Sequence, residues 1–331
     1  MKRTFVSFFA LILMATLAGP AQAAAKPMIL KAAHTLPEDS GLHLGLVEAA
    51  RILDEKSGGT MKIEIYSSGQ LGDNRQLLEQ TQTGLLDIQV NTLAVVSGSF
   101  SQAGEFFYLP FLFKNDRAVE QLLDGEIGNE IFAELEKVNL VGLAWWTQSW
   151  RHLTTTNREV RGPDDVKGLK IRTMDNPIYI DFFKALGASP TPISYSELLA
   201  ALQQGVVDGQ ENPYLNIKQA GFYEVQKYII ETGHVYDVCP LFASKHLWDQ
   251  LNEQQKQWVM EAAAGSRDYM RDVTRKLDAD IKAELLKSGK NVIIELSPEQ
   301  RAQFRAAVEP VYQKWAPKYG NIVERIEALQ K

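Results

Sequence analysis

Apolar and polar positions follow two different periods along the first third of the chain. Short stretches that are apolar, or that alternate with polar residues, predict strands, whereas leucine and alanine recurring every three or four positions predict helices. Strands are predicted at residues 28–33, 61–66 and 86–91, and helices at residues 40–56 and 73–83 lie between them. Ser57-Gly58-Gly59 and Gly84 end these helices. The β-α-β-α-β order is typical of a mostly parallel sheet with helices on its faces.

A second α/β pattern begins near residue 140. Strands are predicted at residues 140–146, 169–174 and 206–209, and helices at residues 177–186 and 195–204. Ser194 and Glu197 have the S-x-x-E spacing of a capping box at the start of the second helix. No Pro/Gly/Ser-rich linker separates the two patterns near residues 146–156. This absence indicates strands that pass directly from one half to the other, as in a hinge.

The last third of the chain predicts one long helix. Residues 252–287 contain no proline and a single glycine, Gly265, and their apolar residues recur three, four or eight positions apart. A helix of about 30 residues would be ~45 Å long, which exceeds the width of one half, so it is expected to run along both. Ser297-Pro298-Glu299 then predicts the start of a further helix.

The first 23 residues are predicted to be a secretory signal peptide. Lys2 and Arg3 precede an apolar run from Phe5 to Ala18, and Ala21-Gln22-Ala23 is a small-x-small cleavage site. The apolar run of about 14 residues is shorter than the ~20 that span a bilayer, and no later run reaches that length. We therefore expect export without insertion of the mature chain into a membrane.

Composition and charge restrict the kinds of function. The chain has 331 residues, of which 45% are hydrophobic and 23% charged, as in ordinary globular proteins with one large or two smaller lobes. A formal net charge of −6 without a basic run gives no footprint for nucleic acid. Cys239 is the only cysteine, so no intramolecular disulfide is expected, and its apolar surroundings favour a buried thiol.

Motifs for cofactor, metal or covalent chemistry are missing. The sequence has no Gly-rich phosphate loop, no G-x-S-x-G and no H-E-x-x-H. Its five histidines lack metal-ligand spacing: His34, His43, His152, His234 and His246. We expect no metal, no cofactor and no enzymatic activity. A secreted hydrolase is the alternative from another class, although none of the 41 acidic residues stands out as a catalytic pair.

An arginine at a strand end is the strongest candidate for ligand binding. Arg172 lies late in the strand predicted at residues 169–174, just before a helix, and open α/β sheets bind ligands beyond the carboxyl ends of strands. Its planar guanidinium matches a carboxylate with two parallel hydrogen bonds. An ion pair at a strand edge is the alternative. Arg151 lies at the predicted crossing between the halves.

Several motifs give the chain a resemblance to a known family. They are Ser68-Gly-Gln-Leu-Gly-Asp-Asn-Arg, Leu109-Pro-Phe-Leu-Phe, Gly168-Leu-Lys-Ile-Arg followed by Phe182-Phe-Lys-Ala-Leu-Gly-Ala-Ser-Pro-Thr-Pro-Ile, and Glu197-Leu-Leu-Ala-Ala-Leu-Gln-Gln-Gly-Val-Val-Asp-Gly-Gln-Glu-Asn-Pro. From about residue 31 to 296 the sequence resembles the extracytoplasmic solute receptors of TRAP transporters, of the dicarboxylate-receptor (DctP) type.

The resemblance implies a periplasmic-binding-protein-like α/β fold. It has two α/β lobes, a hinge of β-strands, a long C-terminal helix spanning both lobes, and a ligand enclosed between them. On this basis we expect lobe 1 to contain residues 24–148 and 237–275, and lobe 2 to contain residues 149–236 and 276–331.

The resemblance also implies site residues. The family's arginine in the G-L-K-x-R block falls on Arg172, a second carboxylate-contacting arginine on Arg151, and the asparagine after Asp-Gly-Gln-Glu on Asn212. Less specific pocket positions are Gln70, Glu38 and Asn91, with Trp146 and Tyr214 as walls. Because strand side chains alternate faces, we expect Trp145 in the core and Trp146 at the pocket, or the reverse.

The expected function is a periplasmic receptor that delivers an organic acid to a TRAP membrane permease. C4-dicarboxylates are the first candidates for the ligand. Sugar acids such as uronates are the alternative, since Glu38, Gln70 and Asn91 are able to bind hydroxyl groups. Ser149 and Tyr214 depart from the glycine and tryptophan common in the family at or near these positions, which bears on the identity of the acid and not on the carboxylate.

Overall fold

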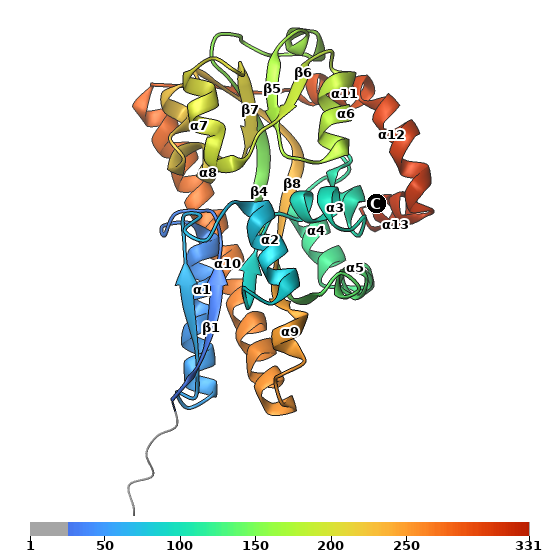
Figure 1. Cartoon of the computed structure of the whole chain (residues 1–331). Helices are drawn as coiled ribbons and strands as arrows, with labels where there is room; N and C mark the ends of the chain where they lie inside the picture. Colours follow the sequence, from blue (N-terminus) through green and yellow to red (C-terminus); the bar gives the residue numbers. More distant parts are fainter. Residues whose placement is uncertain (1–25, 331) are drawn as a thin grey trace, which may run out of the picture.

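The computed structural model describes residues 26–330, so the predicted signal peptide lies outside the described residues. These residues form a mixed α/β fold around one nine-stranded sheet (Figure 1). The strand order is β2-β1-β3-β8-β4-β7-β5-β6, with β9 paired to β8. The α/β class predicted from the sequence is therefore confirmed.

The predicted strands and helices of the first half are present. This half contains β1 (Met28–Ala33), α1 (Gly41–Lys56), β2 (Met61–Tyr66), α2 (Asn74–Thr83), β3 (Ile88–Val90), α3 (Leu93–Ser99), α4 (Asp116–Leu123) and α5 (Glu126–Glu136). Asp73 caps α2, since its carboxylate accepts from the backbone N–H of Arg75 and Gln76, and Gly84 ends α2 in the left-handed conformation.

The second half repeats the α/β arrangement and is followed by helices. Its elements are β5 (Lys170–Thr173), α6 (Pro177–Ala185), β6 (Ser189–Pro192), α7 (Tyr195–Gln203), β7 (Gly209–Asn212) and α8 (Tyr214–Gln219). The later elements are α9 (Lys245–Trp248), α10 (Glu253–Ser288), β9 (Val292–Glu295), α11 (Pro298–Ala307), α12 (Glu309–Trp315) and α13 (Ile322–Leu329). The capping box predicted for α7 is absent, because Ser194 Oγ donates to the Glu197 carboxylate (2.8 Å) and caps no backbone N–H.

Two long antiparallel strands, β4 (Leu140–Thr155) and β8 (Tyr228–Ser244), cross from one half to the other. β8 pairs with β3 at one end, and β4 pairs with β7 at the other. Their mutual register shifts at three places, including Thr147/Trp150 and Arg151/Leu153. The two halves therefore share these strands, as the missing linker predicted, while the exact lobe boundaries stay a prediction.

Two strands differ from their predicted bounds by three residues or more. The strand predicted at residues 140–146 continues to Thr155, and the one predicted at residues 206–209 runs from Gly209 to Asn212. In both places the strand contains polar residues, which the apolar pattern excluded. Gln148 and Gln210 remain in buried strands because their side chains donate to Asp237 and Thr154.

α10 confirms the predicted long helix, with 36 residues and a length of about 54 Å. Near its middle it packs closely on α1, where Gly41 and Gly45 face Thr274 and Met270. Further along, the Asp278 carboxylate accepts from the backbone N–H of Leu215 in α8 (3.0 Å). The helix therefore contacts both halves (Figure 1).

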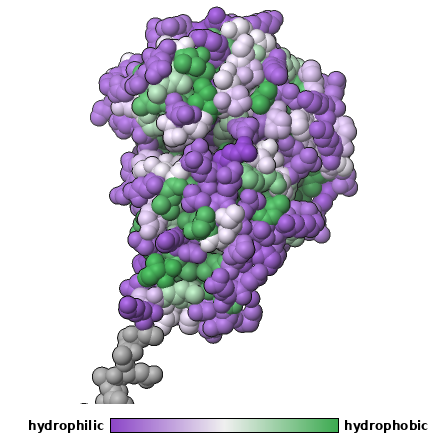
Figure 2. Space-filling view, in the orientation of Figure 1, coloured by the Kyte–Doolittle hydropathy of each residue, from purple (hydrophilic) through white to green (hydrophobic). Residues whose placement is uncertain are grey.

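The C-terminal helices follow one side of the molecule from α6 back to the first half (Figure 1). The hydroxyl of Tyr312 donates to Pro110 O (3.0 Å), and Gln330 Nε2 donates to Leu112 O (3.1 Å). Within residues 26–330, no helix is both long and apolar enough to cross a membrane. Figure 2 shows that hydrophilic residues cover most of one face, with apolar residues in small patches.

Candidate functional site

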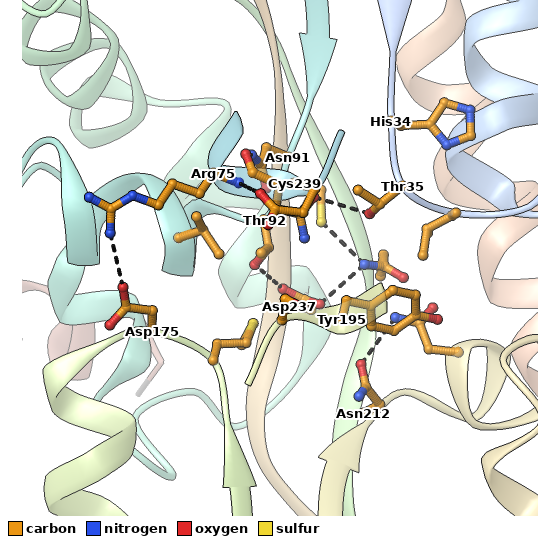
Figure 3. Close-up of a pocket in the computed structure, with 18 of the residues that line it drawn as sticks. His34, Thr35, Arg75, Asn91, Thr92, Asp175, Tyr195, Asn212, Asp237 and Cys239 are labelled. Carbon is orange, nitrogen blue, oxygen red and sulfur yellow. Dashed lines mark hydrogen bonds and ion pairs between the residues drawn. The ribbon is translucent and has the colours of Figure 1, made fainter. Parts of the chain in front are cut away.

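A cavity of about 310 Å³ lies between the two halves of the sheet. β1 and β3 are parallel, as are β5 and β7, but the two pairs run in opposite directions, so their carboxyl ends face each other. Residues that follow these ends line the cavity, together with residues of β4 and β8 (Figure 3). They include Thr35, Asn91, Thr92, Gln148, Arg151, Arg172, Tyr195, Asn212, Asn216, Asp237 and Cys239.

Arg172 is a buried cation without a carboxylate partner. Its side chain comes from β5, is 3% exposed, and donates through Nε to Ile193 O (2.8 Å). Its two terminal nitrogens form no hydrogen bond or ion pair within the described part of the chain. Burial lowers the pKa of Arg172 to about 10. A buried charge left unpaired is costly, so this guanidinium is suited to an anion entering the cavity.

Arg151 also lines the cavity, but protein groups bind all three of its nitrogens. Nε donates to Glu211 Oε2 (2.5 Å) and Nη1 to Asp237 Oδ2 (2.6 Å), while Nη2 reaches Glu211 Oε1 (2.9 Å) and Asn212 Oδ1 (3.1 Å). Burial opposes the charge on Arg151, but Glu211 and Asp237 outweigh it and raise the pKa of Arg151. Arg151 of β4 thus links β7 and β8 through its ion pairs with Glu211 and Asp237.

Three buried amides leave their oxygens free at the cavity. Asn91, Gln148 and Asn216 are each at most 5% exposed. Their NH₂ groups donate to Asn74 O (2.7 Å), Asp237 Oδ2 (3.2 Å) and Asn212 Oδ1 (3.1 Å), respectively. Because each of these partners accepts, the amide oxygens must be the other atoms, and they have no partner among residues 26–330. Three residues that line the cavity therefore carry amide oxygens without a protein partner.

Half of the residues predicted for the site line this cavity. Arg172, Arg151, Asn212 and Asn91 do so, although both ends of the Asn212 amide are already bonded, to Arg151 and Gln210. Gln70 and Glu38 are exposed and lie outside the lining, and the Glu38 carboxylate accepts from Ser67 Oγ (3.3 Å).

The two aromatic walls predicted for the pocket lie in the core instead. Trp146 is fully buried against Met270 and Gly45. Trp145 points to the other face and stacks on Phe132 at 4.1 Å between ring centroids, so neither tryptophan lines the cavity. The hydroxyl of Tyr214 donates to Glu231 (2.9 Å), away from the lining residues.

Sequence reasoning missed Gln148, Asn216, Asp237, Tyr195 and His34. One signal was available for the first and third of these: a polar residue inside a strand that is otherwise buried. His34 carries a second signal, because it directly follows β1, at the same edge as Asn91 after β3. Asn216 and Tyr195 offered no signal, since their helical spacing suits a core position equally well.

A comparison with protein families matches residues 32–318 to DctP, described as bacterial extracellular solute-binding protein, family 7. A protein of Sinorhizobium fredii is 37% identical over 263 residues, and the match covers 79% of this chain. The chain spans about half of that protein's length (48%).

Solved structures of this kind have the same fold. The sugar acid binding protein DctPAm of Advenella mimigardefordensis, in complex with galactonate, is 33% identical with a TM-score of 0.86, and the match covers 92% of this chain and 97% of that one. A TRAP periplasmic solute-binding protein of Sulfurospirillum deleyianum with bound succinate is 26% identical, again with a TM-score of 0.86, covering 92% and 100%.

Proposed function

The chain belongs to the bacterial extracellular solute-binding proteins of family 7, the solute receptors of TRAP transporters, and from this premise we propose that it captures an organic acid with its carboxylate on Arg172. The observation that carries the proposal is the buried guanidinium of Arg172, which has no carboxylate partner within the described residues. A ligand carboxylate would supply two parallel hydrogen bonds and compensate the charge. Arg151, with its nitrogens already bonded, is proposed as a support of the site.

The polar groups of the cavity favour a hydroxylated monocarboxylic acid, such as a sugar acid. The amide oxygens of Asn91, Gln148 and Asn216 accept hydrogen bonds, which hydroxyl groups donate. A second carboxylate placed against these oxygens has no hydrogen to donate and is repelled. The galactonate complex of the Advenella protein supports the same class.

A C4-dicarboxylate is the second candidate, supported by one further cation. Arg75 lines the cavity from α2 and is exposed at its mouth, 3.5 Å from Asp175. A ligand reaching from Arg172 to Arg75 would pair both of its carboxylates. The succinate complex of the Sulfurospirillum protein supports this class.

Three matched probes test the proposal in a thermal-shift and calorimetric titration. D-Galactonate carries one carboxylate and several hydroxyls, galactitol carries the hydroxyls alone, and succinate carries two carboxylates. A ligand at 100 times its dissociation constant adds ~2.7 kcal/mol of stability. We expect D-galactonate to raise the melting temperature more than succinate, and galactitol to have no effect. Equal binding of galactitol would contradict the role of the carboxylate, and a preference for succinate would favour the C4-dicarboxylate.

Transport, and not catalysis, is the proposed outcome of binding. Ligand contacts from both halves would shift an open form toward a closed one, and the loaded receptor would deliver its acid to TRAP membrane permease subunits. In the structure, Asn176 Nδ2 already donates to Ala94 O across the two halves (3.1 Å). Export to the periplasm follows from the signal peptide predicted at residues 1–23. Recovery of a chemically altered ligand after incubation would contradict a purely binding role.

A further inference from the structure

His34 lines the cavity, yet the proposed carboxylate site gives it no role. It directly follows the last residue of β1 (Figure 3). Its exposed fraction is 1%. Its Nε2 lies 3.1 Å from Nδ1 of His43, in the first turn of α1. Its Nδ1 is buried and has no hydrogen-bond partner in the described part of the chain. Nε2 contacts His43, so Nδ1 is the ring nitrogen of His34 that has no bond within the described residues.

The contact between the two rings couples their tautomers. Two neutral imidazoles that meet nitrogen to nitrogen share a single hydrogen. When Nε2 of His34 carries it, Nδ1 of His34 is a bare acceptor. When Nδ1 of His43 carries it, the hydrogen of His34 must lie on Nδ1, which is then a donor. Each ring keeps one hydrogen in both states, so the charge of the pair does not change.

Burial keeps both rings neutral at neutral pH. Burial, together with the neighbouring His43, lowers the pKa of His34 to about 3. Burial also lowers the pKa of His43, against the opposing effect of Glu38. At neutral pH the pair therefore differs between its two states only in where the hydrogens lie.

A hydroxyl group of a ligand needs a donor as well as an acceptor. Asn91, which follows the neighbouring parallel strand, and Gln148 both present free amide oxygens. A ligand hydroxyl that donates to one of these oxygens keeps lone pairs that require a donor of their own. Amide oxygens do not supply one, whereas Nδ1–H of His34 does.

We propose that His34 and His43 form a specificity element for a hydroxylated acid. Nδ1–H of His34 donates to a hydroxyl oxygen of the ligand, and His43 holds His34 in that tautomer by donating its own Nδ1–H to Nε2. The proposal rests on the proposed function and adds a subsite for hydroxyl groups to the carboxylate site at Arg172. His34 contacts the ligand, and His43 is a positioning residue.

The tautomers are measurable in the wild-type protein by two-bond ¹H–¹⁵N correlation spectra of ¹⁵N-histidine-labelled samples. With saturating D-galactonate we expect the hydrogens of His34 and His43 to lie on Nδ1 in both rings. A complex in which His34 is protonated on Nε2 overturns the proposal. This measurement needs no substitution, so it does not depend on the folding of a variant.

Matched substitutions test the effect on affinity. His34→Leu removes the donor, and His43→Leu removes the residue that fixes it; we expect D-galactonate to bind about tenfold more weakly to His34→Leu and severalfold more weakly to His43→Leu. His43→Gln retains an N–H donor and is expected to bind nearly as wild type, a rescue that loss of packing alone does not explain. Wild-type affinity in both leucine variants overturns the proposal.

The failures of the two proposals are distinguishable. Absence of binding for every organic acid tested with the wild-type protein contradicts the proposed function and overturns this inference with it. Binding of D-galactonate that is lost in Arg172→Ala but unchanged in His34→Leu overturns this inference alone.

Discussion

Two buried arginines that line the cavity are in opposite electrostatic situations. Arg151 lies between the carboxylates of Glu211 and Asp237, whereas Arg172 has a single bond to a backbone carbonyl. Glu211 is held ionised, since Arg151 and His234 outweigh burial and lower its pKa to about 2. One arginine therefore stabilises the fold, and the other keeps a charge available at a cost in stability.

This contrast predicts opposite effects of the same substitution. Arg151→Met leaves two buried carboxylates uncompensated and should lower the free energy of unfolding by about 3–5 kcal/mol. Arg172→Met removes an uncompensated charge, so the free energy of unfolding of the ligand-free protein should stay constant or rise. Urea denaturation of both variants measures the difference. Equal destabilisation would show that Arg172 is compensated by the protein itself.

The lining of the cavity could be predicted from the sequence only in part. The sequence predicted Arg172 because its position, late in a strand and before a helix, is a local property of the sequence. Gln148 and Asn216 became part of the cavity through partners in β8 and β7, Asp237 and Asn212, which no local pattern reveals. The same partners explain why Arg151 resembles a ligand-binding residue in sequence but is bonded within the protein.

At the scale of elements, the apolar pattern located six of the nine strands in the described residues and the longest helices. It missed β6, β8 and β9 and several short helices, and it misplaced the ends of the strands that cross the middle. β4 and β7 contain polar residues because neighbouring strands satisfy them, as Thr154 does for Gln210 (2.9 Å). The hydrophobic periodicity of the sequence predicts a loop wherever such polar residues occur. The long α10 was predictable because its pattern is independent of partners.

The packing of α1 on α10 yields a matched pair of glycine substitutions. A Cβ at Gly45 would lie 2.7 Å from Met270 Cγ and 3.0 Å from Trp146, so Gly45→Ala should destabilise by ~1–3 kcal/mol. At Gly265 the nearest atom is the flexible end of Ile52 at 3.0 Å, and Gly265→Ala should be neutral or stabilise by up to ~1 kcal/mol. Thermal unfolding compares the two. A larger loss in Gly265→Ala would contradict this packing.

At the scale of the whole molecule, buried neutral histidines make stability depend on pH. Burial lowers the pKa of His34 and of His152 to about 3, and it lowers the pKa of His234. In the unfolded chain these rings titrate near 6.5. Between about pH 6.5 and 3 the unfolded chain therefore binds more protons, so stability falls as pH falls, by up to ~1.4 kcal/mol per ring and pH unit.

We expect the urea midpoint to fall between pH 7.5 and pH 5, above the range in which most carboxylates titrate. His152→Asn, which retains an acceptor for the N–H of Gly233, should reduce the slope, and His246→Asn, at an exposed position, should not. A midpoint that is constant or rises toward pH 5 would show that these rings are protonated in the folded protein.

The most direct test of the central claim is calorimetric titration of the best-binding acid into arginine variants. Arg172→Ala should bind roughly 30- to 4,000-fold more weakly, corresponding to ~2–5 kcal/mol for a broken buried charge pair. Arg172→Lys should also lose much of its affinity, because an ammonium lacks the planar fork. Arg161→Ala, which removes an exposed arginine paired with Glu159, should bind as wild type. Wild-type affinity in a folded Arg172→Ala would contradict the account.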